Sequence, residues 1–209
     1  NPFISLSTFN SPEIQKKIAK EHFQKKLKNK NNVSRNIVFK NIKIKDKIKV
    51  GYYSSDFKNH AMSQLLAGLF EMHNRDKFEI IGFSLIQNKS DEFKERITKS
   101  FDTFIDVSSK SEKEIAEISR NLDIDIAVDL MGYTKSNRFE IFIEKCAPIQ
   151  INFLGYPGTL GSDCIDYIIA DKTLITKNEE KFYSEKIIYL PDTYQSNDSK
   201  RIISKKKNF

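Results

Sequence analysis

Between residues 47 and 190 the sequence alternates short apolar runs with amphipathic segments, and this alternation strongly limits the folds open to the chain. The apolar runs predict strands over residues 47–54, 78–85, 104–107, 124–131, 149–154, 167–170 and 186–190. Segments with helical spacing lie between them, over residues 63–74, 91–100, 111–121 and 137–145. Strands that alternate with helices form right-handed βαβ units, so we predict an α/β fold: a Rossmann-like parallel sheet with helices on both faces.

A further helix is predicted near the N-terminus, over residues 11–29. Pro12 gives it a start signal. Ile14, Ile18, the pair His22 and Phe23, and Leu27 then repeat at helical spacing. The residues that follow, up to about 45, are polar and charged and predict a connector. We therefore expect three segments: an N-terminal helix and linker over 1–45, a Rossmann-like lobe over 46–195 and a basic tail over 196–209.

The positive charge of the chain does not by itself indicate a nucleic-acid partner. The formal net charge is +7, from 35 basic and 28 acidic residues, but only six of the basic residues are arginine. Nucleic-acid binders concentrate basic groups on one face and often use the planar arginine fork. Here lysine is dense mainly at 16–58 and 200–207. This pattern favours general attraction to anions, and we expect no specific nucleic-acid partner.

Cysteine usage and hydropathy limit the possible metal sites and the cellular setting. Cys146 and Cys164 form no CxxC or Cys/His pair, so we expect buried free thiols and no zinc site. No run of about 18 apolar residues occurs, and the N-terminus lacks the order of a signal peptide. We therefore expect no membrane partner and a location in the cytoplasm.

Polar residues gather where the first predicted strand ends. The segment Gly51–His60 holds Asp56, Asn59 and His60. Open α/β sheets bind ligands at the carboxyl ends of their strands, and histidine exchanges protons near neutral pH. His60 could act with Asp56 or could be a structural residue beside a helix N-terminus, and the sequence leaves both interpretations open. The loop lacks the glycine patterns of dinucleotide and nucleoside triphosphate sites.

Two more predicted strands lead into loops that could carry ligand contacts. The strand over 124–131 is followed by Tyr133 and Thr134, which offer hydroxyl groups, although Thr134 could simply cap a helix. The strand over 149–154 leads into Leu154-Gly-Tyr-Pro-Gly-Thr159. Glycine lets a backbone approach a ligand closely, whereas an ordinary β-turn is the alternative.

The same segments resemble the catalytic region of the protein O-GlcNAc transferases. The matching motifs, in the order of that family, are Gly51-Tyr-x-Ser-Ser-Asp-Phe-x-Asn-His60, His73-Asn-x-Asp-Lys-Phe-Glu79, Gly132-Tyr-Thr-Lys135, Ala147-Pro-Ile-Gln150, Leu154-Gly-Tyr-Pro-Gly-Thr159, Asp166-Tyr-Ile-Ile169 and Tyr183-Ser-Glu-Lys186. They cover roughly residues 48–192. The N-terminal helix resembles the segment that joins tetratricopeptide repeats to this region.

The resemblance implies the amino-terminal lobe of a two-lobed GT-B glycosyltransferase. The implied reaction is inverting transfer of N-acetylglucosamine from UDP-GlcNAc to Ser or Thr hydroxyls of an acceptor protein or peptide, with no cofactor and no metal. A carboxyl-terminal lobe would hold most of the UDP, and we expect the chain to be inactive without it. The implied catalytic residues are His60 and Asp56. The residues expected to bind substrate are Asn59, Tyr133, Thr134, Leu154, Gly155, Pro157 and Thr159.

The chain departs from this family in three respects, one of which is that the expected carboxyl-terminal lobe is missing. Phe3 and Ile4 stand where animal members carry a histidine, and Met62 and Gln64 replace a threonine and a histidine. Two other functions stay open. One is a truncated, non-catalytic scaffold that holds protein partners. The other is a nucleotide sensor, which the missing glycine pattern disfavours.

Overall fold

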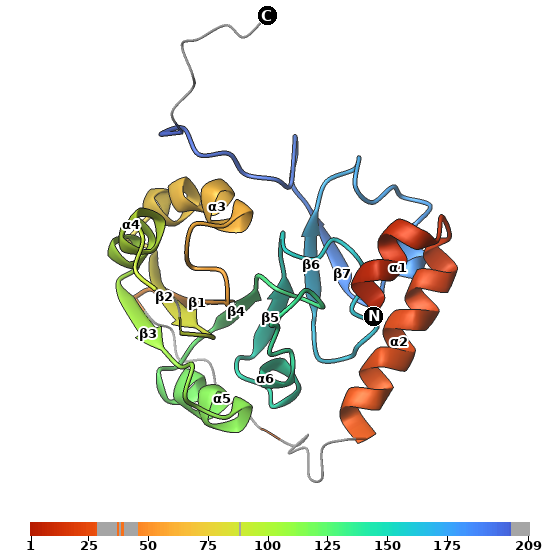
Figure 1. The fold of residues 1–209 in the computed structure, drawn as a ribbon, viewed down its shortest axis with the longest axis horizontal. Coiled ribbons are helices and arrows are strands. Elements are labelled where there is room, and N and C mark those ends of the chain that lie inside the picture. Colours follow the sequence, from red (N-terminus) through yellow and green to blue (C-terminus); the bar gives the residue numbers. More distant parts are fainter. Residues whose placement is uncertain (29–36, 38, 40–45, 88, 202–209) are drawn as a thin grey trace, which may run out of the picture.

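In the computed structural model, which describes residues 1–28, 37, 39, 46–87 and 89–201, seven parallel strands form one sheet (Figure 1). The strands are β1 (Ile48–Ser54), β2 (Phe78–Ser84), β3 (Thr103–Asp106), β4 (Ile126–Asp129), β5 (Ile149–Asn152), β6 (Tyr167–Ala170) and β7 (Lys186–Tyr189). Their order across the sheet is β3-β2-β1-β4-β5-β6-β7. The predicted Rossmann-like sheet is confirmed.

The helices agree with the sequence pattern at most positions. They are α1 (Pro2–Thr8), α2 (Pro12–Lys28), α3 (Ala61–Met72), α4 (Glu92–Ser100), α5 (Glu112–Asn121), α6 (Glu140–Ile143) and the 3-10 turn η1 (Glu180–Phe182). Helix α1 is absent from the predicted elements, because its 7 residues are too few to show a period. Helix α6 is shorter than the predicted 137–145. The Asn137 side chain accepts the N–H of Phe139 at 3.4 Å and holds a turn before the helix begins.

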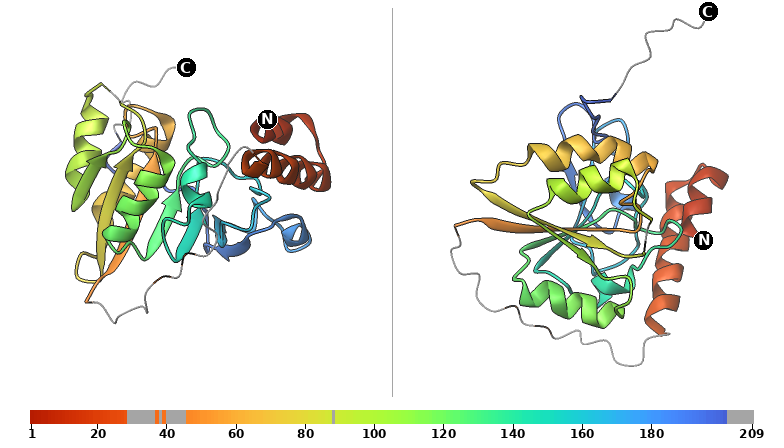
Figure 2. Two further views of the ribbon diagram at one scale, coloured as in Figure 1. Left: turned by 90° about the horizontal axis from the view of Figure 1, so that it is seen from below. Right: turned by 60° about the vertical axis from the view of Figure 1, so that its left-hand side comes forward.

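Helices cover both faces of the sheet, as predicted (Figure 2). On one face, Phe70 of α3 and Ile97 of α4 belong to an apolar cluster with Val50 of β1. On the other face, Ile115 of α5 and Phe142 of α6 belong to a second cluster. Strands buried on both faces are expected to be apolar along their whole length, which explains the continuous apolar runs in the sequence.

Helix α2 packs into the second cluster. Its Ala19 and Phe23 are 0% and 3% exposed, and they share the cluster with Tyr133 and Tyr156. The predicted connector from α2 to β1 lies mostly outside the described residues, as does the predicted tail beyond residue 201. The predicted segment boundaries at 45 and 195 stay predictions. Within the described ranges, none of the helices has the length and apolar character needed to cross a membrane.

Candidate active site

Three loops meet at one edge of the sheet because of the strand order. The strands β1 and β4 are neighbours although β2 and β3 lie between them in sequence, and β5 pairs with the other side of β4. Since these strands are parallel, the loops after them share the carboxyl edge, at the topological switch point where open α/β sheets bind ligands. We call residues 55–60, 130–139 and 153–166 the β1, β4 and β5 loops.

His60 is both a helix cap and an accessible imidazole. Its Nδ1 atom accepts the N–H of Met62 at 3.3 Å, as the N-cap of α3. The same Nδ1 lies 3.8 Å from Oδ2 of Asp56, too far for a hydrogen bond but within reach of an ion pair when the ring is protonated. The side chains of His60 and Asp56 are 46% and 19% exposed. In the neutral ring, capping through Nδ1 leaves the proton on Nε2.

Asn59 lies exposed on the β1 loop, and its backbone is fixed to α4. Its N–H donates to Asp91 at 2.9 Å, and the Asp91 side chain also caps α4. The Asn59 side-chain oxygen accepts a hydrogen bond from Gln64 at 3.0 Å. The N–H of Asn59 is the main cause that lowers the pKa of the Asp91 carboxyl. The Asn59 amide therefore stays accessible on a loop whose backbone is held in place.

In the β4 loop, the hydroxyls of Tyr133 and Thr134 are bonded within the protein. Tyr133 is 1% exposed, and its hydroxyl donates to the carbonyl of Leu160 at 2.7 Å. The half-buried Thr134 donates its hydroxyl to the carbonyl of Met131 at 2.9 Å. A direct contact between Tyr133 and a substrate would require the loop to move. Its place among the substrate-binding residues stays a prediction, while in this structure it joins the β4 and β5 loops.

Asp129, the last residue of β4, is absent from the predicted site residues. It is 1% exposed and accepts the N–H groups of Met131 at 2.9 Å and Gly132 at 3.1 Å. Burial raises the pKa of Asp129 to about 6, and the two N–H groups act in the opposite direction. A carboxyl that titrates near neutrality at a switch point is a candidate functional group. An acidic residue at the end of an apolar strand is its only sequence signal.

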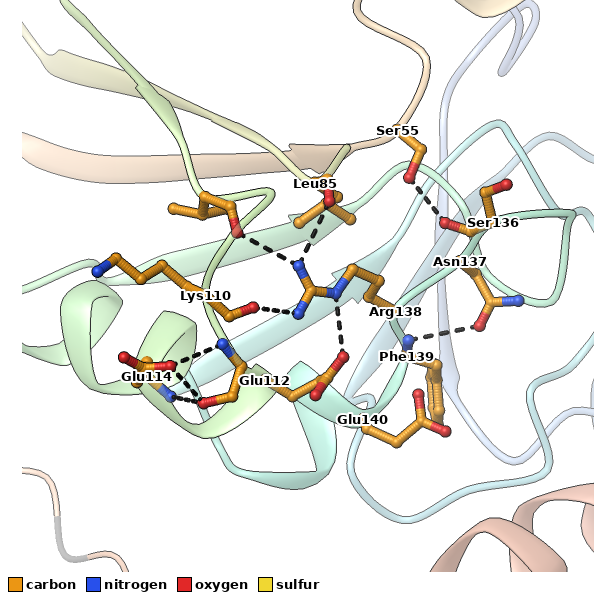
Figure 3. Close-up of polar contacts among 12 residues, drawn as sticks. Ser55, Leu85, Lys110, Glu112, Glu114, Ser136, Asn137, Arg138, Phe139 and Glu140 are labelled. Atoms are coloured by element: carbon orange, nitrogen blue, oxygen red, sulfur yellow. Dashed lines mark hydrogen bonds and ion pairs between the residues drawn. The ribbon is translucent and has the colours of Figure 1, made fainter. Parts of the chain in front are cut away.

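Figure 3 shows how the β4 loop is fixed to its neighbours. Ser55 of the β1 loop donates its hydroxyl to the carbonyl of Ser136 at 2.7 Å. The guanidinium of Arg138 donates to the carbonyls of Leu85 and Val107, each at 3.3 Å, where β2 and β3 end. The planar fork of arginine can reach several carbonyls at once, which the single ammonium of lysine does poorly. The Arg138 side chain thus joins the β4 loop to the segments that follow β2 and β3 at the same edge.

The β5 loop begins with a strained turn. Leu154 has a φ angle of +66°, and the N–H of Gly155 donates across it to the carbonyl of Phe153 at 2.9 Å. A Cβ atom on Gly155 would overlap the carbonyl oxygen of Leu130, so only glycine fits. Leu154 also packs against the apolar cluster that contains Met62, the residue whose N–H is capped by His60. Backbone strain of this kind costs about 1–3 kcal/mol and clusters at functional sites.

The later part of the β5 loop is anchored to the segment before β7. Thr159, predicted to bind substrate, is 5% exposed and donates its hydroxyl to Glu185 at 2.7 Å. The N–H of Leu160 donates to the other oxygen of Glu185 at 2.7 Å. The carbonyl of the half-buried Pro157 accepts the hydroxyl of Tyr183 at 3.2 Å. Burial raises the pKa of Glu185, although the hydrogen bonds from Thr159 and Leu160 oppose the shift. No sequence pattern indicates this anchor, because an acidic residue before a strand is usually exposed.

The cysteines agree with the prediction of buried free thiols. Burial raises the pKa of Cys146 and of Cys164 to about 12. Across the described ranges, no three His, Cys, Asp or Glu side chains are grouped as the ligands of a metal ion would be.

A family model described as glycosyl transferase family 41 matches residues 2–208. The chain belongs to this family. It is 41% identical over 155 residues to the probable UDP-N-acetylglucosamine–peptide N-acetylglucosaminyltransferase SEC of Arabidopsis thaliana, over 74% of this chain and 16% of that protein. It is 33% identical over 162 residues to the UDP-N-acetylglucosamine–peptide N-acetylglucosaminyltransferase of Caenorhabditis elegans, over 75% of this chain and 14% of that protein.

The fold of this family 41 chain also matches a solved structure. A mutant O-GlcNAc transferase of Thermobaculum terrenum aligns with a TM-score of 0.82 at 23% identity, over 92% of this chain and 37% of that one. The resemblance that the motifs predict is therefore confirmed. Because the chain spans only 16% and 14% of the two curated relatives, the reactions of those whole proteins enter here as a proposal.

Proposed function

We propose that this chain is the amino-terminal lobe of a glycosyltransferase that transfers N-acetylglucosamine from UDP-GlcNAc to Ser or Thr hydroxyls of proteins, with inversion at the anomeric carbon. The observation that carries the proposal is the meeting of three loops at the switch point, with the accessible His60 on one and the strained Leu154 turn on another. Membership of family 41 supports the reaction class. The names of both curated relatives include the sugar donor and a peptide acceptor.

His60 is the proposed acceptor of the proton from the attacking hydroxyl. If the neutral ring instead carries its proton on Nδ1, facing Asp56, Nε2 holds the lone pair and can take the hydroxyl proton. The hydroxyl oxygen then bonds to the anomeric carbon while the bond from that carbon to UDP breaks, and UDP leaves with the electron pair. The Asp56 carboxylate, now 3.8 Å from Nδ1, would stabilise the imidazolium that forms.

The β5 loop is the proposed wall of the sugar pocket. Leu154, Gly155 and Pro157 lie on it, and all are half-buried. The turn at Leu154 holds this backbone before a sugar arrives, and such preorganisation lowers the ordering cost of binding. The amide of the exposed Asn59 is the proposed polar contact from the β1 loop. That the transfer needs no metal stays a prediction, and turnover in the presence of EDTA tests it. The location in the cytoplasm also stays a prediction.

Turnover of UDP-GlcNAc by the complete protein that contains this chain tests the proposal. Asparagine is a good N-cap, so His60→Asn should keep α3 stable while removing the proton acceptor. We expect kcat to fall by about a hundredfold or more. Lys77→Gln, at the opposite edge of the sheet, is the control and should match the wild type. Normal turnover by His60→Asn would contradict the assignment of His60, and a wild-type protein without turnover would contradict the reaction.

A second lobe is the proposed source of most UDP contacts. Titration of UDP into the 209-residue chain should then show much weaker binding than titration into the complete protein. Equal affinities would contradict this division of the site.

The scaffold function has one observation in its favour. Phe3, Ile4 and Phe9, on and beside α1, are 47%, 60% and 42% exposed, and contiguous exposed apolar patches mark protein-interaction sites. A complete protein that binds a protein partner through these residues but does not consume UDP-GlcNAc would favour the scaffold over the enzyme.

A further inference from the structure

The hairpin formed by α1 and α2 lies directly against the β5 loop. A Cβ atom on Gly161 would lie 2.5 Å from the backbone nitrogen of Lys20, so the loop and the α2 backbone are in close contact. The ring of Phe3 on α1 packs near that of Tyr156, with centroids 6.5 Å apart. Figure 1 shows the hairpin alongside the end of the sheet formed by β6 and β7. The N-terminal helices therefore form one side of the support for this loop.

Lys16 of α2 supplies the polar part of this support. Its Nζ donates to the carbonyls of Lys181 at 2.7 Å and Tyr183 at 3.3 Å. The hydroxyl of Tyr183 in turn donates to the carbonyl of Pro157. Burial, followed by a neighbouring lysine, lowers the pKa of Lys16, while the Glu185 carboxylate acts in the opposite direction. Lys16 thus joins α2 to the same short segment that anchors the β5 loop.

We propose that Lys16 is a positioning residue for the sugar site. Lys16 bonds the backbone of Lys181 and Tyr183 and so holds the segment before β7. That segment in turn bonds the β5 loop, at Pro157 through the Tyr183 hydroxyl and at Thr159 through the Glu185 carboxylate. The inference rests on the proposed function, because the β5 loop faces the sugar only if that function is right. It gives the N-terminal hairpin a role in donor binding that no motif of the sequence indicates.

The test compares Lys16→Met with Lys17→Met in the complete protein. Lys17 is exposed on the same helix and serves as the matched control. Hydrogen exchange of the Leu160 and Gly161 amides reports the order of the loop, and KM for UDP-GlcNAc reports donor binding. A typical hydrogen bond changes an equilibrium by roughly threefold to tenfold. We therefore expect Lys16→Met to increase the exchange rate of these amides and the KM for UDP-GlcNAc by roughly that factor. Lys17→Met should match the wild type, and the kcat of both variants should stay near the wild-type value.

Tyr183→Phe is the second variant, because it removes only the hydroxyl bonded to Pro157. It should also raise KM and the exchange rate, even if Lys16→Met fails to fold. The proposal is overturned if Tyr183→Phe and a folded Lys16→Met both keep the wild-type exchange rate and KM. It is also overturned if Lys16→Met and Lys17→Met change these values equally. Exchange does not depend on turnover. A protein without transferase activity in which Lys16→Met still loosens the loop would therefore count against the proposed function and support the positioning role.

Discussion

Asp129 of β4 and Asn152 of β5 are in-register neighbours, and both side chains are buried. The Asn152 amide nitrogen donates to the carbonyl of Tyr156 at 2.8 Å. Its Oδ1 atom has no hydrogen-bond partner among the residues that the structure describes. In-register residues of adjacent strands lie on the same face of a sheet, so a protonated Asp129 is a suitable donor for this oxygen. Burial raises the pKa of Asp129 to about 6, which favours the protonated carboxyl that such a bond would need.

The stability of the protein should therefore depend on pH through Asp129. Folding raises the pKa of this carboxyl from 3.8 to about 6, so the folded state favours the protonated form. The stability gained this way is complete below the unfolded value and is lost as the pH rises through about 6. Between about pH 4 and pH 7 the wild type should lose up to about 3 kcal/mol relative to Asp129→Asn. Urea unfolding across this range measures the difference, and a difference independent of pH would refute the prediction.

Gly155→Ala should displace the β5 loop. The added methyl group would overlap the carbonyl oxygen of Leu130, and neither backbone can yield without disturbing the turn at Leu154. We expect a loss of about 3 kcal/mol in the free energy of unfolding, as for an overpacked core, together with loss of donor binding. Lys135→Ala on the exposed part of the β4 loop is the control and should change stability by less than about 0.5 kcal/mol. Chemical denaturation and donor titration of both variants check the prediction.

Arg138→Gln should loosen the carboxyl edge of β2 and β3. The variant loses the bonds to the carbonyls of Leu85 and Val107 and the 3.0 Å contact with Glu112. We expect the free energy of unfolding to fall by about 2 kcal/mol, because carbonyls at this edge lose a charged donor. Lys113→Gln, exposed on α5, should leave it unchanged. If the two variants unfold at the same urea concentration, Arg138 does not hold these loops together.

Thr159→Val and Thr159→Ser separate the hydroxyl of Thr159 from its shape. Valine keeps the volume but leaves the buried Glu185 without one of its donors, whereas serine keeps the donor. We expect valine to lower the free energy of unfolding by about 1–3 kcal/mol. The serine variant should recover most of that loss. Thermal unfolding of both proteins provides the measurement, and equal behaviour would mean that the hydroxyl bond adds nothing.

Local patterns predicted local structure well. The helix predicted over 111–121 is present as α5, and a capping box between Ser111 and Glu114 forms at its start. Asp56 and His60 lie four residues apart in the sequence and are also neighbours in space. The strand pattern predicted the parallel sheet, and with it the edge at which the loops meet. In each case the information lies within a few residues or in a repeated period.

Side chains whose partners are far away in the sequence were harder to predict. The polar loops predict that Tyr133 and Thr159 bind substrate, yet each hydroxyl bonds a protein group 27 or 26 residues away in the sequence. Asp129 gives only a weak signal, as an acidic residue at the end of an apolar strand, and Glu185 gives none, because the burial of a carboxyl depends on segments that pack over it. The helix α2 was predicted, but not its packing on the β5 loop, which follows from the close contact at Gly161.

Because the strands run in the same direction, the turns at their amino ends lie a strand's length away from the β1, β4 and β5 loops. Lys77 is exposed in one of these turns, just before β2. Both native thiols are buried, and their high pKa keeps them unreactive near neutral pH. A cysteine introduced in place of Lys77 would therefore take a fluorophore selectively, and donor-induced motion could be followed in solution without a dye inside the pocket.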